Sequence, residues 1–321
     1  MQACIDLGSN SFHLLIGKWI DGRIHIVERL SDKVQLGENV RQTGVISPAA
    51  FARGMGCLHR FKAIMNSYPL EQYWALGTNT FRVTSNANDF VAAASADVGI
   101  EISIISGVQE AVLIYAGVIT SLPDSDCNRL VIDVGGGSTE VIIGSGHKRT
   151  FTESLAIGSV AWRDRFFADP HAEKPKLNAQ IDAGKEAAKA VFDAAAPGVK
   201  RANWSEAYAS SGTMKMLANI CTEQGFGTGV IQLEALHKLR KKLVNTIAKR
   251  RVLPGLKETR RELLLPGWCV MVGLMESYAV EEIRFSPTAL REGMLDFMVK
   301  NEKTLDAMKR SDLPDISCAK P

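Results

Sequence analysis

The segments IDLGSNS, at residues 5–11, and IDVGGGS, at residues 132–138, follow one pattern: apolar, aspartate, apolar, glycine, two small residues, serine. Each predicts a strand, a tight polar turn and the beginning of a second strand. Each also opens one half of the 321-residue chain. Because internal repeats set the architecture, we expect a duplicated α/β domain with a cleft between the halves.

A polar break, LPDSD at residues 122–126, separates the two halves. We therefore place the first domain at 1–123 and the second at 124–300, with a closing helix at about 300–315 that packs back on the first. Periodicity and turn residues predict strands at 3–7, 12–20, 23–30, 72–76, 100–105, 130–134, 140–143, 206–209 and 283–285. They predict helices that begin at Pro48 after a Ser47 cap, at 88–98 after an Asn88 cap, and at 108–119, 176–196, 233–252, 260–280 and 290–300, with a bend or division at Pro266-Gly267.

Composition and charge exclude several classes of protein. The chain is 46% hydrophobic with a net charge of +3, which is too small an excess to indicate a nucleic-acid-binding protein. It contains no apolar run of the roughly 18–20 residues that a membrane span needs, and its beginning does not resemble a signal peptide. The six cysteines are scattered without a C-x-x-C pair, which argues against a zinc site or a disulfide framework and favours a cytoplasmic location.

The two glycine-rich turns suit anion binding, because backbone N–H groups free of bulky side chains can converge on a phosphate. Ser9, Asn10, Ser11, Ser138 and Thr139 can add side-chain donors. Asp6 and Asp133, at the ends of the preceding strands, suit Mg²⁺, held directly or through water. The alternative is a pair of ordinary hairpin turns, which a matched repeat makes less attractive.

Three further features leave alternatives open. Glu110, in the first turn of a predicted helix, is either a favourable partner of the helix dipole or a general base. Arg82, after a predicted strand, is either a solvated surface residue or a phosphate clamp. The basic run at residues 237–261 is either a solvated helix face or a track for a long polyanion, and it lacks the aromatic residues of a single-stranded nucleic-acid groove.

Six segments, taken in order, resemble the exopolyphosphatase/guanosine pentaphosphate phosphatase family. They lie at residues 5–12, 77–82, 105–111, 132–140, 211–213 and 290–293. The resemblance implies an actin-like ATPase (ribonuclease H-like) fold, duplicated, with the active site in the interdomain cleft. It also implies a homodimer and an Mg²⁺-dependent hydrolase, with another divalent cation as the alternative cofactor.

The resemblance also assigns roles. It makes Glu110 the general base that activates water, and Asp133 and Glu140 the metal-associated carboxylates, with Asp6 as a third. It gives phosphate binding to Asn10, Arg82, Gly135, Gly136 and Ser138. Together with the turn residues above, the predicted phosphate-binding set is Ser9, Asn10, Ser11, Arg82, Gly135, Gly136, Gly137, Ser138 and Thr139.

This sequence departs from the family in two places. Gln109 stands where many members have another Glu, which changes the local charge and leaves the base in place. The long members carry further C-terminal helical domains, and in a chain of 321 residues we expect the polymer-gripping or regulatory role of those domains to be missing.

The favoured function is an exopolyphosphatase that releases terminal orthophosphate from inorganic polyphosphate. The first alternative is a guanosine pentaphosphate 5′-phosphatase, alone or as a second activity. The second is a non-hydrolytic, actin-like nucleotide-binding protein, which the presence of Glu110 argues against. We expect no membrane and no specific nucleic acid among the partners.

Overall fold

The computed structural model describes residues 1–305 of the chain, apart from residues 22, 147 and 170. The chain divides into two compact units, each with its own hydrophobic core. The first unit comprises Met1–Pro123 together with residues 288–305, and the second comprises Asp124–Pro287.

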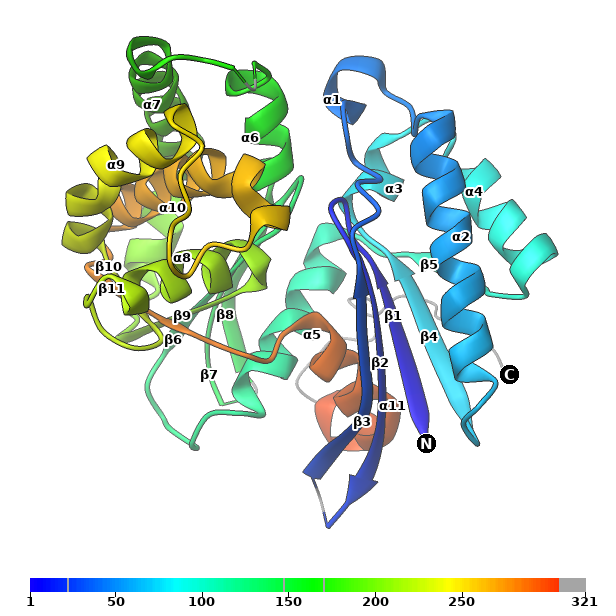
Figure 1. The fold of residues 1–321 in the computed structure, drawn as a ribbon. Helices are drawn as coiled ribbons and strands as arrows, with labels where there is room; N and C mark the ends of the chain where they lie inside the picture. Colours follow the sequence, from blue (N-terminus) through cyan, green and yellow to red (C-terminus); the bar gives the residue numbers. More distant parts are fainter. Residues whose placement is uncertain (22, 147, 170, 306–321) are drawn as a thin grey trace. The chain divides into compact units, whose positions relative to one another are not determined.

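The first unit is built on a five-stranded sheet with the order β3-β2-β1-β4-β5 (Figure 1). Its strands are β1 (Gln2–Leu7), β2 (Phe12–Ile20), β3 (Arg23–Asp32), β4 (Gln72–Gly77) and β5 (Ile102–Ile104). The first three form an antiparallel meander, and β4 and β5 are added in parallel to β1. Its helices are α1 (Val40–Thr43), α2 (Pro48–Met65), α3 (Asn79–Val83), α4 (Ala87–Ala93), a π-helical turn (Ala94–Val98), α5 (Gly107–Ile119) and α11 (Leu290–Leu305).

The second unit repeats this topology. Read from the corresponding edge, its sheet has the order β8-β7-β6-β9-β11, with β10 added at the far side. Its strands are β6 (Arg129–Val134), β7 (Thr139–Ser145), β8 (Lys148–Leu155), β9 (Glu206–Ser210), β10 (Val230–Gln232) and β11 (Glu282–Phe285). Again the first three are antiparallel, and β9 and β11 are parallel to β6. The duplicated, actin-like α/β fold predicted from the repeat and the resemblance is therefore confirmed.

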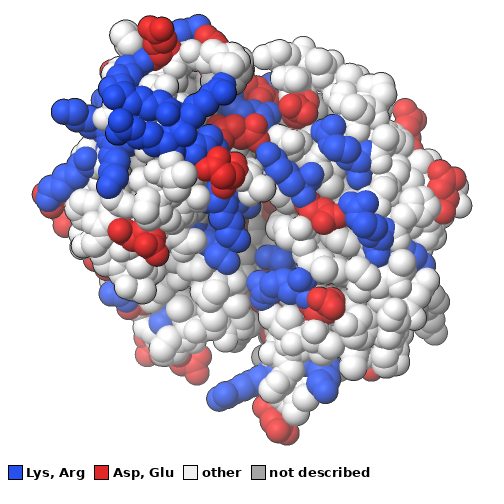
Figure 2. Space-filling view, viewed as in Figure 1, with Lys and Arg blue, Asp and Glu red and all other residues white. Residues whose placement is uncertain are grey.

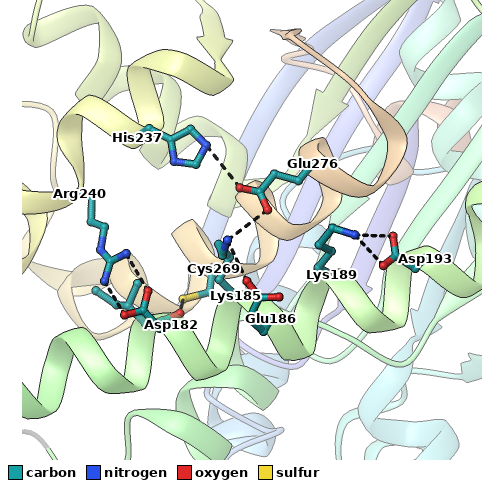
Figure 3. Close-up of polar contacts among 10 residues, drawn as sticks. Asp182, Lys185, Glu186, Lys189, Asp193, His237, Arg240, Cys269 and Glu276 are labelled. Atoms are coloured by element: carbon teal, nitrogen blue, oxygen red, sulfur yellow. Dashed lines mark hydrogen bonds and ion pairs between the residues drawn. The ribbon is translucent and has the colours of Figure 1, made fainter.

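The helices of the second unit are α6 (Ser159–Phe166), α7 (Lys174–Arg201), α8 (Ser211–Glu223), α9 (Leu233–Ala248), a 3₁₀ helix (Glu258–Leu263) and α10 (Leu264–Tyr278). The apolar helix α10 is buried along almost its whole length and packs on α7, where a Cβ on Gly273 would lie 2.8 Å from the Cβ of Ala188. Polar contacts then tie α9 to both helices (Figure 3). Arg240 of α9 pairs with Asp182 of α7 at 2.7 Å, and Glu276 of α10 lies 3.3 Å from Lys185 of α7 and 3.4 Å from His237 of α9.

The predicted division of the chain needs one correction, because residues 288–300 belong to the first unit rather than to the second. Helix α11 packs against α5 and β1 (Figure 1). Two glycines permit this close approach: a Cβ on Gly117 would lie 1.8 Å from the carbonyl oxygen of Ala289, and one on Gly293 would lie 1.8 Å from that of Leu113. The part of the expected closing helix beyond residue 305 lies outside the described residues.

Several element boundaries also differ from those predicted. Helix α7 runs from Lys174 to Arg201 and includes Pro197, although the predicted helix ended at residue 196. The region 260–280 is divided before Leu264 instead of at Pro266-Gly267, because proline is tolerated in the first turn of α10. Helix α4 begins after Asn86 rather than Asn88, and α9 ends at Ala248 rather than at residue 252. Strand β8 and helix α6 were not predicted, whereas Ser47 caps α2 as predicted, its Oγ accepting a bond from the N–H of Ala50.

Candidate active site

The turn between β1 and β2 is closed by its own backbone. The N–H of Gly8 donates to the carbonyl oxygen of Ser11 at 3.2 Å, and a Cβ on Gly8 would lie only 3.1 Å from that oxygen. The carbonyl oxygens of Ser9 and Asn10 accept bonds from the following loop, from Gly37 and Gln35. The N–H groups of Ser9 and Asn10 donate no hydrogen bond within the part of the chain that the structure describes. The carbonyl oxygens of the turn are thus bonded within the protein, whereas these N–H groups are available to bind an anion, as in the backbone motif called a nest.

The turn between β6 and β7 has the same geometry. The N–H of Gly135 donates to the carbonyl oxygen of Ser138 at 2.9 Å. Helix α6 begins directly on this turn, with the N–H groups of Ser159 and Val160 donating to the carbonyl oxygens of Gly135 and Gly136 at 3.0 and 2.9 Å.

The close approach of α6 to the turn between β6 and β7 requires a glycine at position 158. A Cβ there would lie 2.4 Å from the carbonyl carbon of Gly136 and 2.6 Å from the nitrogen of Gly137. Among the described residues, the N–H groups of Gly136 and Gly137 have no acceptor. Helix α6 therefore covers one side of the glycine turn, and two amides are left to bind an anion.

Two carboxylates lie side by side in the second unit. Asp133 of β6 and Glu140 of β7 are direct partners across the antiparallel pair, so their side chains share one face of the sheet. Ser154 donates to Glu140 at 2.8 Å, and the hydroxyl of Ser210 bonds to Asp133. Like charges placed directly opposite one another are unfavourable unless a cation offsets them. The donor set of Asp133 and Glu140 therefore fits a hard divalent cation.

In the first unit, the position opposite Asp6 is occupied by His13 rather than by a second carboxylate. Nearby, the Oδ1 atom of Asn10 is buried without a hydrogen-bond partner in the described chain, while its Nδ2 donates to Ser11 at 3.1 Å. An unpaired acceptor suits a cation's hydration water better than a phosphate oxygen, which refines the role predicted for Asn10. No group of three or more His, Cys, Asp or Glu side chains within residues 1–305, the three undescribed positions aside, is arranged to hold a metal. The carboxylates thus suit an ion such as Mg²⁺, which takes one or two protein ligands and completes its shell with water and phosphate.

Glu110 and Arg82, predicted as separate site residues, form an ion pair. Helix α5 begins at a capping box made by Ser106 and Gln109, which places Glu110 in the first turn with only 8% of its surface exposed. The Nη1 atom of Arg82 lies 2.8 Å from the Oε2 atom of Glu110 and also donates to the carbonyl oxygen of Ile105 at 3.0 Å. Burial raises the pKa of Glu110, and the charge and hydrogen bond of Arg82 oppose that shift only in part. A carboxylate with a raised pKa is closer to the range in which a general base works near neutral pH.

The hydroxyl of Thr139 is committed to the fold as a donor, whereas that of Ser9 is engaged there as an acceptor. The hydroxyl of Thr139 is fully buried and donates to the carbonyl oxygen of Ile157 at 2.7 Å, so it positions the segment before α6 instead of facing a ligand. The hydroxyl of Ser9 accepts a bond from Thr80 at 2.9 Å in a buried contact that Gly37 covers. Ser11 and Ser138 are also buried. The backbone amides of the turns, rather than these side chains, are therefore the main candidates for binding phosphate.

The structure adds Ser210 to the candidate site and gives Arg260 a place there. Ser210 contacts Asp133, and the next residue, Ser211, begins α8 with a φ of 94°, a strained backbone value for a residue other than glycine. The guanidinium of Arg260 lies over Gly212, where a Cβ would meet its Nη2 atom at 2.1 Å. Burial lowers the pKa of Arg260, and its side chain forms no ion pair or hydrogen bond among the described residues. Residues 211–213 were already identified in the sequence as a family-like segment, but only the fold places Arg260 against Gly212.

Comparison with known proteins places these features in a family context. A model of the Ppx/GppA phosphatase family matches residues 15–302. A guanosine-5′-triphosphate,3′-diphosphate pyrophosphatase of Pseudoalteromonas translucida is 36% identical over 97% of the chain, and the chain spans 62% of the length of that relative. A protein of Haemophilus influenzae that bears a provisional exopolyphosphatase name is 32% identical over 95% of this chain and 93% of its own.

Solved structures agree with this match. An exopolyphosphatase of Cytophaga hutchinsonii superimposes with a TM-score of 0.83 at 27% identity, covering 94% of this chain and 99% of its own. A Ppx/GppA family member of Aquifex aeolicus superimposes with a TM-score of 0.75 at 24% identity, covering 94% of this chain and 98% of its own. The second similarity supports the fold alone.

Proposed function

The chain belongs to the Ppx/GppA phosphatase family, and from this premise we propose that it is an exopolyphosphatase that releases terminal orthophosphate from inorganic polyphosphate. The observation that carries the proposal is the buried pair of Glu110 and Arg82, because it supplies a carboxylate held in place and tuned toward neutral pH. The exopolyphosphatase names of two relatives support the choice of substrate.

The reaction follows from the chemistry of these groups. Glu110 accepts a proton from a water molecule, whose oxygen forms a bond to the terminal phosphorus. The bond between that phosphorus and its bridging oxygen breaks, and the electron pair leaves with the shortened chain. The amides of Gly136 and Gly137 donate to phosphate oxygens, and Arg82 holds Glu110 in position while offering positive charge to the anion.

Asp133 and Glu140 would hold Mg²⁺, or another divalent cation, which would offset the negative charge of the terminal phosphates. Asp6 is the third carboxylate that we assign to this role, with the unpaired Oδ1 of Asn10 nearby as an acceptor for a metal-bound water.

A second candidate function is a guanosine pentaphosphate 5′-phosphatase. The name of the 36%-identical relative from Pseudoalteromonas translucida favours it. The same groups would perform the same displacement on the terminal phosphate of a nucleotide, so the two functions differ in substrate and not in chemistry.

Phosphate release tests the proposal. Wild type, Glu110→Gln and a control variant, Glu101→Gln, which alters an exposed carboxylate of the same unit, would each be assayed with long-chain polyphosphate or guanosine pentaphosphate, with and without Mg²⁺. We expect release from polyphosphate by the wild type and the control, and a loss of roughly 10²–10⁴-fold in Glu110→Gln. Faster release from the nucleotide would favour the second function, and no release from either substrate would refute both.

We also propose a cytoplasmic location and a homodimer. Cys4, Cys57, Cys127, Cys221 and Cys269 are all free thiols, as in proteins of reducing compartments. None of the helices in the described part of the chain is long and apolar enough to cross a membrane. The homodimer rests on the family alone, and light scattering of the purified protein tests it.

A further inference from the structure

Lysine and arginine side chains gather on one face of the second unit, over α9 and the segment that follows it (Figure 2). The structure separates the basic run at 237–261 into cations that already have partners and cations that do not. Lys238 pairs with Glu234, Arg240 with Asp182, and Arg261 with Glu258. His237 contacts Glu276 (Figure 3). The contacts of Arg240 and His237 tie α9 to α7 and α10, and all four contacts engage their cations within the protein.

Lys242 bonds to Gln224 and Arg250 contacts His171, and the exposed cations that remain form a shorter set. The side chains of Lys241, Lys249, Arg251 and Lys257 are exposed and have no ion pair or hydrogen bond within the described residues. The nearby acids Glu258 and Glu262 are engaged by Arg261 and Arg163. Since like charges in a cluster repel one another, such a set is stabilised by a bound polyanion.

Two arginines of the 3₁₀ helix connect this set to residues near the glycine turn and Asp133. Arg261 donates to the carbonyl oxygens of Arg251 and Thr246 at 2.8 and 3.2 Å, which fixes the turn after α9 against the 3₁₀ helix. Its neighbour Arg260 lies over Gly212, two residues after Ser210, which bonds to Asp133. The contacts of Arg261 and Arg260 therefore connect the segment around Arg251 to the beginning of α8, which follows Ser210 and its bond to Asp133.

Helix α8 extends this connection. A Cβ on Gly255 would lie 2.6 Å from the carbonyl oxygen of Asn219, and Arg260 covers Gly212. Positions 212, 215 and 219 share one face of a helix, because residues three and four apart are neighbours. Lys215, which is exposed, therefore lies on the face of α8 that Gly255 and Arg260 contact. With Lys215 and Arg260, the basic strip comprises six residues: Lys215, Lys241, Lys249, Arg251, Lys257 and Arg260.

We propose that the basic strip binds the phosphates of inorganic polyphosphate that follow the terminal one. The inference rests on the proposed function and specifies a polymeric substrate for the same site. A chain of repeating anions without bases matches a strip of unpaired cations. A single-stranded nucleic acid would in addition require stacking surfaces, and residues 237–261 contain no aromatic side chain.

The test compares two triple variants of equal charge change. The strip variant is Lys249→Gln, Arg251→Gln, Lys257→Gln, which leaves Arg260 and the catalytic groups unaltered. The control variant is Lys148→Gln, Lys200→Gln, Arg201→Gln. Two of the control residues lie far from the strip. Arg250, which is next to Lys249 and Arg251 in the sequence, contacts His171 just before α7. Lys200 and Arg201 lie at the other end of that 28-residue helix, about 40 Å away at 1.5 Å per residue.

Two readouts separate this inference from the proposed function. The first is binding of labelled long-chain polyphosphate and of an equally long single-stranded DNA without divalent cations, over a range of salt concentrations. For the strip variant we expect a loss of polyphosphate affinity of at least about tenfold and a decrease of about 2 in the slope of log K against log salt, at about 0.7 per phosphate contact. The second is phosphate release from tripolyphosphate, which we expect to be unchanged in the strip variant, while release from long chains falls.

Equal loss in the control variant, or no loss in the strip variant, overturns the inference. So does binding of DNA as tightly as polyphosphate, which identifies the strip as a nucleic-acid surface. Failure of the proposed function is seen independently, as a lack of phosphate release by the wild type whether or not the strip binds the polymer. Circular dichroism of both variants ensures that lost binding is not lost folding.

Discussion

The ion pair of Arg82 and Glu110 makes the protonation of Glu110 the property most open to test. Their side chains are 18% and 11% exposed, with 2.8 Å between the charged atoms, so water screens the pair only weakly. In Arg82→Gln, Glu110 keeps its burial and loses its cation. We expect the pKa of Glu110, already above its ordinary value because of burial, to rise further.

The sign of the pH dependence follows from this direction. At pH values below the ordinary range of Glu, the carboxyl is protonated in the folded and unfolded states, so loss of Arg82 has little effect on stability. As the pH rises through the folded-state pKa, the wild type gains an ion pair that the variant lacks. Removal of one partner of a buried pair destabilises by about 3 kcal/mol, and we expect that loss at pH 8 and a smaller loss at pH 5.

Two assays check this expectation. Urea denaturation at pH 5 and pH 8 measures the free energy of unfolding of wild type, Arg82→Gln, Glu110→Gln and the double variant. The pH dependence of kcat/KM for phosphate release measures ionisation of the base, and its acidic limb should lie above the ordinary range of Glu and move to higher pH in Arg82→Gln. An equal loss of stability at both pH values, or an acidic limb that does not move, would refute the assignment of Glu110 as a base controlled by Arg82.

Three further predictions concern the second unit. In Gly158→Ala the new Cβ would press on the backbone of Gly136, so we expect kcat/KM to fall at least tenfold and the free energy of unfolding to fall by about 2 kcal/mol. The control is Gly56→Ala, where a Cβ would meet nothing closer than 3.7 Å. Steady-state kinetics and urea denaturation should show no change in this control. In Asp133→Asn we expect a higher Mg²⁺ concentration for half-maximal phosphate release, and an unchanged Mg²⁺ titration would exclude Asp133 as a ligand. In Glu276→Gln we expect a loss of about 1 kcal/mol in thermal or urea denaturation, because α9 loses one of its polar contacts, and no change would mean that packing alone holds it.

Local pattern was enough to predict most of the fold. The repeat at residues 5–11 and 132–138 predicted the duplication, and the two turns indeed share their closing hydrogen bond. The predicted boundaries failed where local signals are weak. Pro266 lies where proline is tolerated, and Pro197 remains inside a long helix. The cleft expected between the halves stays a prediction.

The sequence by itself determined the turns, the aspartates before them and the place of Glu110 in the first turn of a helix, because strand ends and helix caps depend on residues that are neighbours in the sequence. Tertiary structure decided what those residues contact. Only the fold pairs Arg82 with Glu110, buries the hydroxyl of Thr139 and lays Arg260 over Gly212. The physical reason is that charge pairing and burial depend on contacts between segments that are many residues apart. The spacing of residues along the chain does not predict which of these segments come into contact.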